Sequence, residues 1–402
     1  MSSLPFRVLA GLASVSLLTT ALATAANADE ADGTVVASGL VSPRHLTVAP
    51  NGDLYISESG AAGADCITFD VATEPVQPAP AECGSYDPEE HETWTDVYAG
   101  ATGSVTLLSH TGVQSRVVTG LPSVSPAEGD FAGPSDVSVH GKTLTITVGL
   151  GAPPEARDAF VDAYGDFYAG LATVQSAKMT GPRTAVGASA DLAQFEADYN
   201  PHDAMHDTNP NAVSADGNGW LLADAGGNDV MRLDHQGNLS LIAVFPDVMV
   251  DAPPWLLPEL PPGVTQLPME FVPTSIERGP DGAIYVSQLT GFPFPAGGSS
   301  IWRIGADGVP MQWATGLTNV TDLTFGPDGS LYAVQIADDG LTSEASLTDG
   351  SLLRVGPGAD NSEVIATGLF APYGVAVYKN HAYVTTGTVL PGGGEVVRFD
   401  LD

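Results

Sequence analysis

Acidic and amide side chains recur at two places in a pattern that the chain repeats, and their oxygens are suited to binding a cation or a polar small molecule. The first place is the start of an apolar segment, and the second lies just after the next apolar segment. Hard divalent cations such as calcium prefer carboxylate and amide oxygens. The candidate ligand-binding residues are His45, Glu58, Asp136, Asn209, Asn211, Asp224, Asn228, Gln288, Asp322 and Gln335. The candidate calcium ligands among them are Glu58, Asp136, Asn211, Asp224 and Asp322.

A second polar cluster occupies residues 200–211 and contains two histidines. His202 and His206 are four residues apart, which would place them on one face of a helix as a pair of metal ligands. Pro201 and Pro210 favour a loop instead, and no glutamate lies between the histidines to act as a general base. A solvated turn is therefore the favoured interpretation. No nucleophile elbow, phosphate-binding loop or zinc-protease motif is present, so catalysis is left open.

The pattern that positions these residues is a β-hairpin repeated six times. The clearest copies are residues 43–57, 273–287 and 320–334, and weaker copies begin near residues 134, 210 and 372. In the clear copies an Asn-Gly or Asp-Gly turn joins two apolar strands, because glycine accepts the positive φ that the turn requires. Hairpins repeated at such intervals predict an all-β fold, a six-bladed β-propeller whose first strands line a central channel. Both places of the pattern then lie at one end of that channel.

The two ends of the chain carry complementary parts of one repeat. Third strands recur after most hairpins, and outer strands follow them with a Thr-Gly-Leu ending, as at residues 119–121, 315–317 and 367–369. The chain ends just after a third strand, while residues 34–40 have the form of the missing outer strand. We therefore expect the termini to share a blade and close the ring, which protects the sheet edges.

Uneven spacing of the repeats predicts insertions at about 59–102, 123–132, 151–172, 188–208 and 247–271. Residues 153–171 and 190–199 have helical patterns, so short helices are expected there. The proline-rich segment 245–271 is expected to be an irregular, extended loop. Insertions on a rigid scaffold are usual places for function.

The first 28 residues have the pattern of a secretory signal peptide. Arg7 precedes an apolar run, and small residues near position 28 fit a cleavage site. The expected mature protein is one domain, residues 29–402, without a membrane span and located outside the cell or on the exterior of the cell envelope. Cys66 and Cys83 lie close together in the first insertion, and in an exported protein they predict a disulfide.

The chain is strongly acidic, with 48 Asp and Glu against 13 Lys and Arg and a net charge of −35. Such a surface repels nucleic acids and anionic lipids, which excludes both as expected partners. The acidity is explained either by solubility in an extracellular setting or by binding of divalent cations. We expect a monomer whose partner is a small molecule or an extracellular protein.

Three segments resemble the ScyD/ScyE family. They are residues 209–229 with Ala-Asp-Ala-Gly-Gly-Asn-Asp, residues 272–295 with Leu-Thr-Gly-Phe-Pro-Phe-Pro, and the late run 393–398. The resemblance implies an exported six-bladed propeller, related in fold to NHL-repeat, streptogramin-lyase-like and calcium-dependent lactonase propellers. No established catalytic residues come with it, and His202 and His206 are not typical of the family.

Two hypotheses for function follow. The first is an exported, non-catalytic propeller that binds a ligand or partner through its insertion-rich face. The alternative is a calcium-dependent hydrolase or lyase of the lactonase type that acts at the channel mouth with the five candidate calcium ligands. A quinone-dependent dehydrogenase is disfavoured because Trp is sparse, with five residues in the chain.

Overall fold

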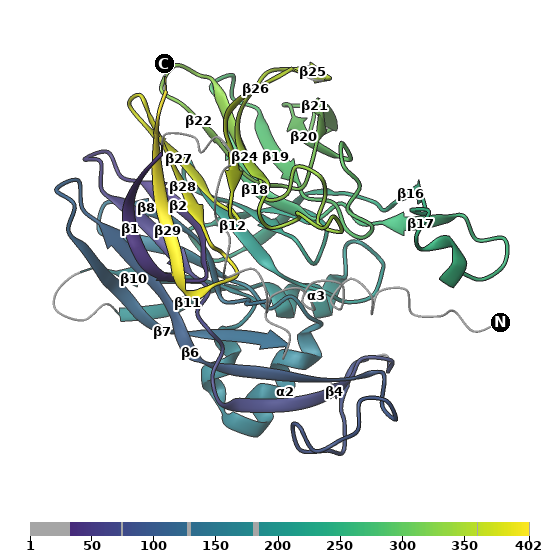
Figure 1. Ribbon diagram of the computed structural model, residues 1–402. Coiled ribbons are helices and arrows are strands. Elements are labelled where there is room, and N and C mark those ends of the chain that lie inside the picture. Colours follow the sequence, from purple (N-terminus) through teal and green to yellow (C-terminus); the bar gives the residue numbers. More distant parts are fainter. Residues whose placement is uncertain (1–32, 74, 127–129, 180–184, 360, 402) are drawn as a thin grey trace.

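The fold is described from a computed structural model of the chain, which covers residues 33–73, 75–126, 130–179, 185–359 and 361–401 (Figure 1). The chain is mostly β, as the sequence predicts. The expected signal peptide lies outside the described residues. Within them, no helix is long and apolar enough to cross a membrane.

Six of the sheets in the described chain are built on four antiparallel strands, and two of these six sheets carry additional strands. The four strands follow chain order except in the last sheet, which β1 (Thr34–Val41) joins. The first sheet is built on β2 (Pro43–Val48), β3 (Leu54–Glu58), β6 (Trp94–Leu108) and β7 (Gln114–Pro126), and two strands of the first insertion extend it. The second consists of β8 (Pro134–His140), β9 (Thr143–Val148), β10 (Thr173–Lys178) and β11 (Ala185–Asp191). The third consists of β12 (Pro210–Asp216), β13 (Gly219–Asp224), β14 (Asp229–Asp234) and β15 (Leu239–Val244).

The remaining three sheets follow the same plan. The fourth consists of β18 (Pro273–Arg278), β19 (Ile284–Gln288), β20 (Ser299–Ile304) and β21 (Pro310–Leu317), with β25 (Gly358–Ala359) beside β21. The fifth consists of β22 (Val320–Phe325), β23 (Leu331–Gln335), β24 (Gly350–Val355) and β26 (Ser362–Leu369). The sixth consists of β27 (Val375–Tyr378), β28 (His381–Thr386), β29 (Pro391–Asp400) and β1 (Thr34–Val41).

The first strand of each sheet contacts the first strand of the next. Strand β2 contacts β8, β8 contacts β12, β12 contacts β18, β18 contacts β22, and β22 contacts β27. Strand β27 in turn contacts β2. The sheets therefore surround one central axis, with later strands further out. This sheet order is that of a β-propeller.

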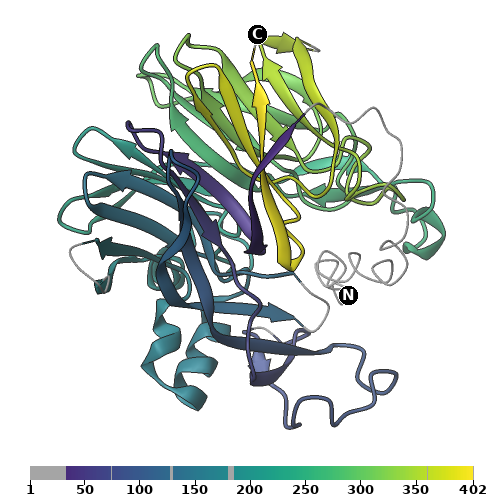
Figure 2. The same cartoon turned by 60° about the vertical axis from the view of Figure 1, so that its left-hand side comes forward.

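Strand β1 joins the sheet formed by the end of the chain. It pairs antiparallel with β29, from Thr34 opposite Arg398 to Val41 opposite Pro391. Figure 2 shows the purple N-terminal strand beside the yellow C-terminal one. The first and last described strands thus share one sheet.

The core lies between neighbouring sheets. One hydrophobic cluster combines Tyr332 and Val334 of the fifth sheet with Val375, Val384 and Phe399 of the sixth. Every residue of β3, β19 and β23 is buried, because these second strands are covered on both faces. This packing fixes the strand ends from which the polar residues project.

The longer insertions form strands and helices of their own. The long strand β6 extends beyond β3 and pairs there with β4 (Asp65–Asp70), which carries the short strand β5 (Gln77–Pro78). Helix α2 (Pro154–Tyr164) and the 3-10 helix η2 (Asp166–Gly170) occupy the predicted helical range 153–171. Helix α3 (Leu192–Tyr199) occupies the second one and contacts α2.

The structure confirms the predicted disulfide and corrects one insertion. Cys66 and Cys83 are bonded. The proline-rich segment contains a hairpin of β16 (Val248–Asp251) and β17 (Gln266–Met269), with the 3-10 helix η3 (Leu257–Glu259) between them, rather than an irregular loop throughout. Pro268 is tolerated because this sheet has two strands, and each strand therefore has an edge where no N–H is needed.

Candidate functional site

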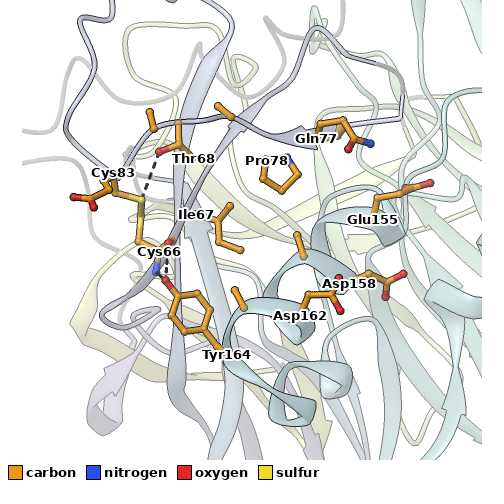
Figure 3. Close-up of a pocket in the computed structure, with 16 residues that line it drawn as sticks. Cys66, Ile67, Thr68, Gln77, Pro78, Cys83, Glu155, Asp158, Asp162 and Tyr164 are labelled. Carbon is orange, nitrogen blue, oxygen red and sulfur yellow. Dashed lines mark hydrogen bonds between the residues drawn. A yellow bond between two sulfur atoms is a disulfide. The ribbon is translucent and has the colours of Figure 1, made fainter.

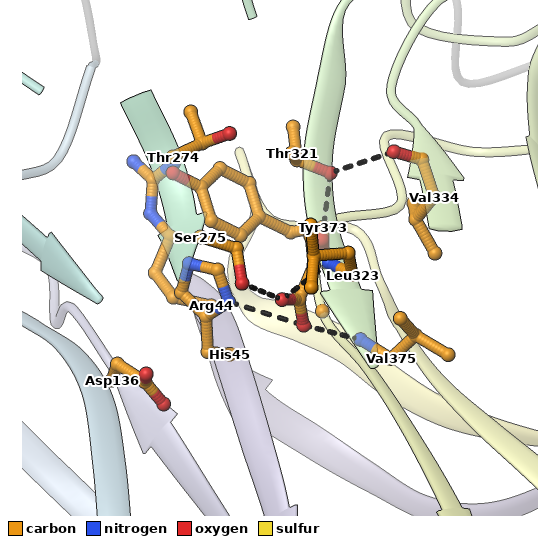
Figure 4. A network of polar contacts seen from close by, with 12 residues as sticks. Arg44, His45, Asp136, Thr274, Ser275, Thr321, Leu323, Val334, Tyr373 and Val375 are labelled. Atoms are coloured by element: carbon orange, nitrogen blue, oxygen red, sulfur yellow. Dashed lines mark hydrogen bonds and ion pairs between the residues drawn. The ribbon is translucent and has the colours of Figure 1, made fainter. Parts of the chain in front are cut away.

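A buried pair of side chains, His45 and Asp322, lies at the centre of the molecule. His45 Nδ1 is 3.1 Å from Asp322 Oδ2, and the side chain of His45 is 2% exposed. Asp322 also accepts hydrogen bonds from Ser275 Oγ at 2.6 Å and from the backbone N–H groups of Leu323 at 2.8 Å and Val375 at 2.7 Å (Figure 4). Burial alone lowers the pKa of His45, but the attraction and hydrogen bond of Asp322 outweigh it, so the pKa is raised.

Asn211 lies on the other side of the His45 ring. Its Nδ2 donates to Thr274 O at 2.6 Å and lies 3.2 Å from His45 Nε2. Its Oδ1 accepts from Ser135 Oγ at 2.8 Å and from the Tyr373 hydroxyl at 2.9 Å. With the amide oriented in this way, His45 Nε2 accepts a hydrogen bond and Nδ1–H donates to the carboxylate in the neutral tautomer.

Tyr373 and Arg44 pack beside this pair. The edge-to-face rings of Tyr373 and His45 are 5.0 Å apart, and the Arg44 guanidinium carbon is 4.7 Å from the centre of the Tyr373 ring. Arg44 donates to Phe131 O at 2.7 Å and to Ser59 Oγ at 3.2 Å. The imidazole is thus enclosed by protein groups, so His45 has little contact with solvent.

Two further carboxyl groups lie close to the pair of His45 and Asp322. Burial raises the pKa of Asp136 to about 6, a rise that His45 opposes and Asp322 reinforces. Burial likewise raises the pKa of Glu277 to about 8, and the nearby Asp322 and Asp136 add to that rise. The carboxyl oxygens accept backbone N–H groups, from Val213 to Asp136 at 2.8 Å and from Phe325 to Glu277 at 3.1 Å.

Glu277 was not among the predicted site residues. It follows Ser275 by two positions on β18, and residues two apart in a strand face the same side. His45, Asp136 and Asp322 occupy the position of Ser275 in their own repeats, two residues after the first residue of the aligned segment. Extending the alignment of the repeats by two residues would have identified Glu277 as a neighbour of this set.

Glu58 lies within the first sheet and stabilises its outer strands. Its carboxylate accepts from Val41 N–H at 2.7 Å, Thr106 Oγ1 at 2.6 Å and Arg116 Nη2 at 2.9 Å. Burial alone raises the pKa of Glu58, but the bonds from Arg116 and Thr106 and the backbone hold it below its usual range.

Asp224 organises the loop around it. Its Oδ1 accepts the N–H groups of Asn209 at 2.6 Å and Gly227 at 3.0 Å, and its Oδ2 accepts from Thr208 Oγ1 at 2.6 Å. The Asn209 side chain lies so close to Gly149 that a Cβ there would be 2.3 Å from Asn209 Oδ1.

The three remaining predicted residues also hold loops or strand ends. Asn228 Oδ1 accepts from Val272 N–H at 2.8 Å. Gln335 Oε1 accepts from Thr318 N–H at 2.7 Å, and Gln288 Oε1 accepts from Trp302 Nε1 at 3.1 Å. The structure thus brings His45, Asp136, Asn211 and Asp322 together and places the other predicted residues near the ends of their own sheets.

The five candidate calcium ligands do not fit a calcium ion as one set. Asp136, Asn211 and Asp322 belong to the central cluster, whereas Glu58 and Asp224 are engaged elsewhere, each with several hydrogen-bond donors. In the described chain, the one group of three His, Cys, Asp or Glu side chains whose ligand atoms all lie within 4.8 Å of one another is Cys66, Cys83 and Asp96. Its two sulfurs are joined in the disulfide.

A separate pocket of about 760 Å³ lies between the disulfide-linked insertion and helix α2 (Figure 3). The Tyr164 hydroxyl joins the two parts, since it accepts from Cys66 N–H at 3.1 Å and donates to Cys66 O at 2.7 Å. Apolar lining comes from Ile67, Val76, Pro78, Ala79, Ala81, Ala159 and Ala163. Acidic lining comes from Glu82, Glu155, Asp158 and Asp162.

No protein-family model and no curated protein matches the chain. Among solved structures, it is similar to a catalytically inactive virginiamycin B lyase from Staphylococcus aureus with quinupristin, at 10% identity and TM-score 0.43 over 92% of this chain and 98% of that one. A putative gluconolactonase has 11% identity and TM-score 0.44 over 92% and 93%. A putative oxidoreductase (glucose dehydrogenase) from Thermus thermophilus has 15% identity and TM-score 0.48 over 91% and 98%. Similarity at this level does not extend to function.

Proposed function

We propose that this protein is an exported six-bladed β-propeller, closed by β1, that binds a small molecule in the pocket between its first insertion and α2. The six four-stranded sheets and the contacts among their first strands support the blade number. The pairing of β1 with β29 supports the closure. The ScyD/ScyE-like segments at residues 209–229 and 272–295 agree with a propeller of this kind.

The pocket is the observation that carries the binding proposal. Its volume of about 760 Å³ is within the range of small-molecule sites. It is built from an insertion that a disulfide closes on itself and that the Tyr164 hydroxyl links to α2. A pocket held in this way is organised before its ligand arrives, which lowers the entropy cost of binding.

The lining of the pocket favours a cationic ligand with an apolar body. Four carboxylate residues line it together with seven apolar ones, and no Lys or Arg of the described chain does so. The net charge of −35 attracts cations to the whole surface and raises their rate of encounter. An ammonium or guanidinium group at the acidic lining and a ring against the alanines would satisfy both parts.

Calorimetric titration with two matched probes tests this proposal. Tryptamine and indole-3-propionate share the indole ring and differ in charge, so we expect the mature protein to bind tryptamine at least tenfold more tightly. Asp158→Asn with Asp162→Asn should weaken that binding, and Ala159→Trp should block it. Asp307→Asn, in an exposed turn outside the pocket, is the control. Equal binding of both probes, or full binding by Ala159→Trp, would contradict the proposal.

The central cluster favours a second candidate, the lactonase or lyase type of hydrolase. The raised pKa of Asp136, about 6, would let its carboxylate act as a general base near neutral pH. Calcium has no single cage among the five predicted residues, so this candidate requires that the cluster opens to substrate. Lactone hydrolysis measured with calcium and with EDTA tests it. An activity that Asp136→Asn removes would support it, and an activity unchanged in that variant would exclude it.

A further inference from the structure

Two carboxylates face each other across the hairpin of β13 and β14. Asp224 ends β13 and Asp229 begins β14, and the two are direct antiparallel partners. Such partners project from the same face of a sheet with Cβ atoms about 5 Å apart, and like charges in this arrangement destabilise the pair. Asp224 is 3% exposed and Asp229 is 1% exposed, so water does not screen them.

A third carboxylate approaches the same hairpin from α3. Glu196 is 3% exposed, and burial together with Asp224 raises its pKa to about 7. Burial, Asp224 and Glu196 raise the pKa of Asp229 well above its usual range. Three acidic side chains from a helix and two strands therefore share one buried region.

One fully buried oxygen of these three side chains has no hydrogen-bond partner. Both oxygens of Asp224 are engaged by the loop, with donors that include Asn209, Gly227 and Thr208. Asp229 Oδ1 has no hydrogen-bond partner, although the residue is buried. None of the ion pairs among the described residues involves Glu196, Asp224 or Asp229.

We propose that Glu196 and Asp229 bind a hard divalent cation, of the Mg²⁺ or Ca²⁺ class, between α3 and the β13–β14 hairpin. Asp224 acts as the positioning residue that fixes the loop carrying Asp229. A cation there would neutralise the like charges and occupy the unpartnered oxygen of Asp229. It is separate from the central cluster and from the five-residue calcium set.

The composition of the site decides the class of metal. Carboxylate oxygens are the charged ligands, and hard cations accept backbone carbonyls and water as the rest of their shell. Within the described chain, Glu196 and Asp229 belong to no group of three His, Cys, Asp or Glu side chains whose ligand atoms all lie within 4.8 Å of one another. Backbone carbonyls and water would therefore have to complete the shell of the cation. His202 and His206 lie nearby but pair with Asp247 at 3.3 Å and Glu155 at 3.6 Å, which disfavours a softer, histidine-bound metal.

Metal analysis and calorimetry of the mature protein test the proposal. We expect up to one equivalent of Mg²⁺ or Ca²⁺ by mass spectrometry before EDTA treatment, and saturable binding when either ion is returned. Asp229→Asn and Glu196→Gln keep the shape of each side chain, and each should weaken binding at least tenfold. Asp307→Asn and Asp136→Asn should bind as the parent does. Unchanged binding by Asp136→Asn would show that the ion lies outside the channel.

Three results would overturn the proposal. The first is a parent protein that holds no ion as purified and gives no binding heat with either cation, a result that needs no variant to fold. The second is loss of binding in Asp136→Asn with full binding in Asp229→Asn, which would place the ion in the channel. The third combines two observations: metal does not change the unfolding temperature of the parent, and Asp229→Asn unfolds at a higher temperature than the parent. Together they would show that a proton, not a cation, occupies Asp229.

Discussion

A single carboxylate, Asp322, connects four first strands of the propeller. It belongs to β22, pairs with His45 of β2, accepts from Ser275 of β18 and accepts from the backbone of Val375, at the start of β27. Because all four strands lie around the axis, the loss of this one side chain affects several sheets together. Its contribution to stability can be measured by unfolding experiments, which do not depend on any catalytic activity.

The Asp322→Asn substitution should lower the free energy of unfolding by about 3 kcal/mol, because it leaves a buried imidazole without its charged partner. The amide NH2 group also replaces one of the two oxygens, so it faces a backbone N–H, either that of Leu323 or that of Val375, which donates to the native carboxylate. Urea unfolding followed by tryptophan fluorescence measures the change, with Asp307→Asn as the control. A loss below about 0.5 kcal/mol, the usual range for a surface site, would contradict this interpretation.

The carboxyl groups of the channel predict that stability falls as pH rises above the acidic range. The folded pKa values are raised from 3.8 to about 6 for Asp136 and from 4.5 to about 8 for Glu277. The folded state therefore binds protons more tightly than the unfolded state, and ionising these groups destabilises it. The raised pKa of His45 acts in the same direction, since its stabilising proton is lost as pH rises through the folded value.

We expect the midpoint of thermal unfolding to be several degrees lower at pH 8 than at pH 5. Glu277→Gln should flatten this dependence over most of the interval from pH 4.5 to about 8, and Asp136→Asn should flatten it only below about pH 6. Calorimetric scans in buffers of equal ionic strength provide the measurement. A midpoint that rises steadily from pH 5 to pH 8 would show that these groups ionise freely in the folded protein.

At the scale of elements, the first insertion acts as one unit because the disulfide and Tyr164 both hold β4. The disulfide spans a sequence separation of 17 residues, and Phe69 of β4 packs 6.1 Å from the Phe160 ring of α2. The insertion extends the sheet of β6 and β7 rather than contributing to the central axis. The insertion should therefore be able to unfold locally while the propeller strands keep their structure.

Replacing Cys66 and Cys83 by serine should open this unit locally. A crosslink over such a short loop contributes about 3 kcal/mol in the chain-entropy account, and that loss should appear mainly as faster hydrogen exchange in β4 and α2. The first strands of the sheets should keep their protection. Tyr164→Phe, which removes two hydrogen bonds and retains the ring, should give a smaller effect in the same segments. Uniform loss of protection across all sheets would contradict a separable insertion.

The sequence was most informative where backbone chemistry is local. The turn glycines Gly52, Gly282 and Gly329 have φ values of 87°, 79° and 83°, which is the left-handed conformation that made the hairpins recognisable. Side-chain partners distant in the chain were not predictable in the same way. Glu58 bonds to Arg116 at a separation of 58 residues, so its engagement depends on the register of β6 and β7.

Candidate site residues were partly identified for the same reason. Repeat alignment grouped His45, Asp136 and Asp322, and these lie together because equivalent positions of all repeats surround one axis. The repeat does not describe the insertions, so neither the pocket beside α2 nor the approach of Glu196 to Asp229 could be derived from it.

At the scale of the whole molecule, the sixth sheet depends on β1 for its outer strand. Deleting residues 33–41 would expose the edge of β29 and remove the buried side chains of Ala37 and Leu40 from the core. We expect the truncated protein to unfold at a temperature at least about 5 °C lower, the scale of a loss of a few kcal/mol, or to aggregate. Adding a synthetic peptide of residues 33–41 should restore stability, whereas a scrambled peptide should not. Unchanged unfolding of the truncated protein would mean that β1 is dispensable for the stability of the sixth sheet.

The β1–β29 pairing also has a consequence for the order in which the molecule is completed. A ribosome makes Thr34 long before its partner Arg398, so the sheet of β1 and β29 remains unfinished until β29 has been translated. Contacts of such long range slow folding. During that interval β1 is an unattached strand, and at high concentration it can pair with β29 of another copy. Strand-exchanged dimers are therefore the expected by-product of refolding this protein from denaturant, and dilution should suppress them.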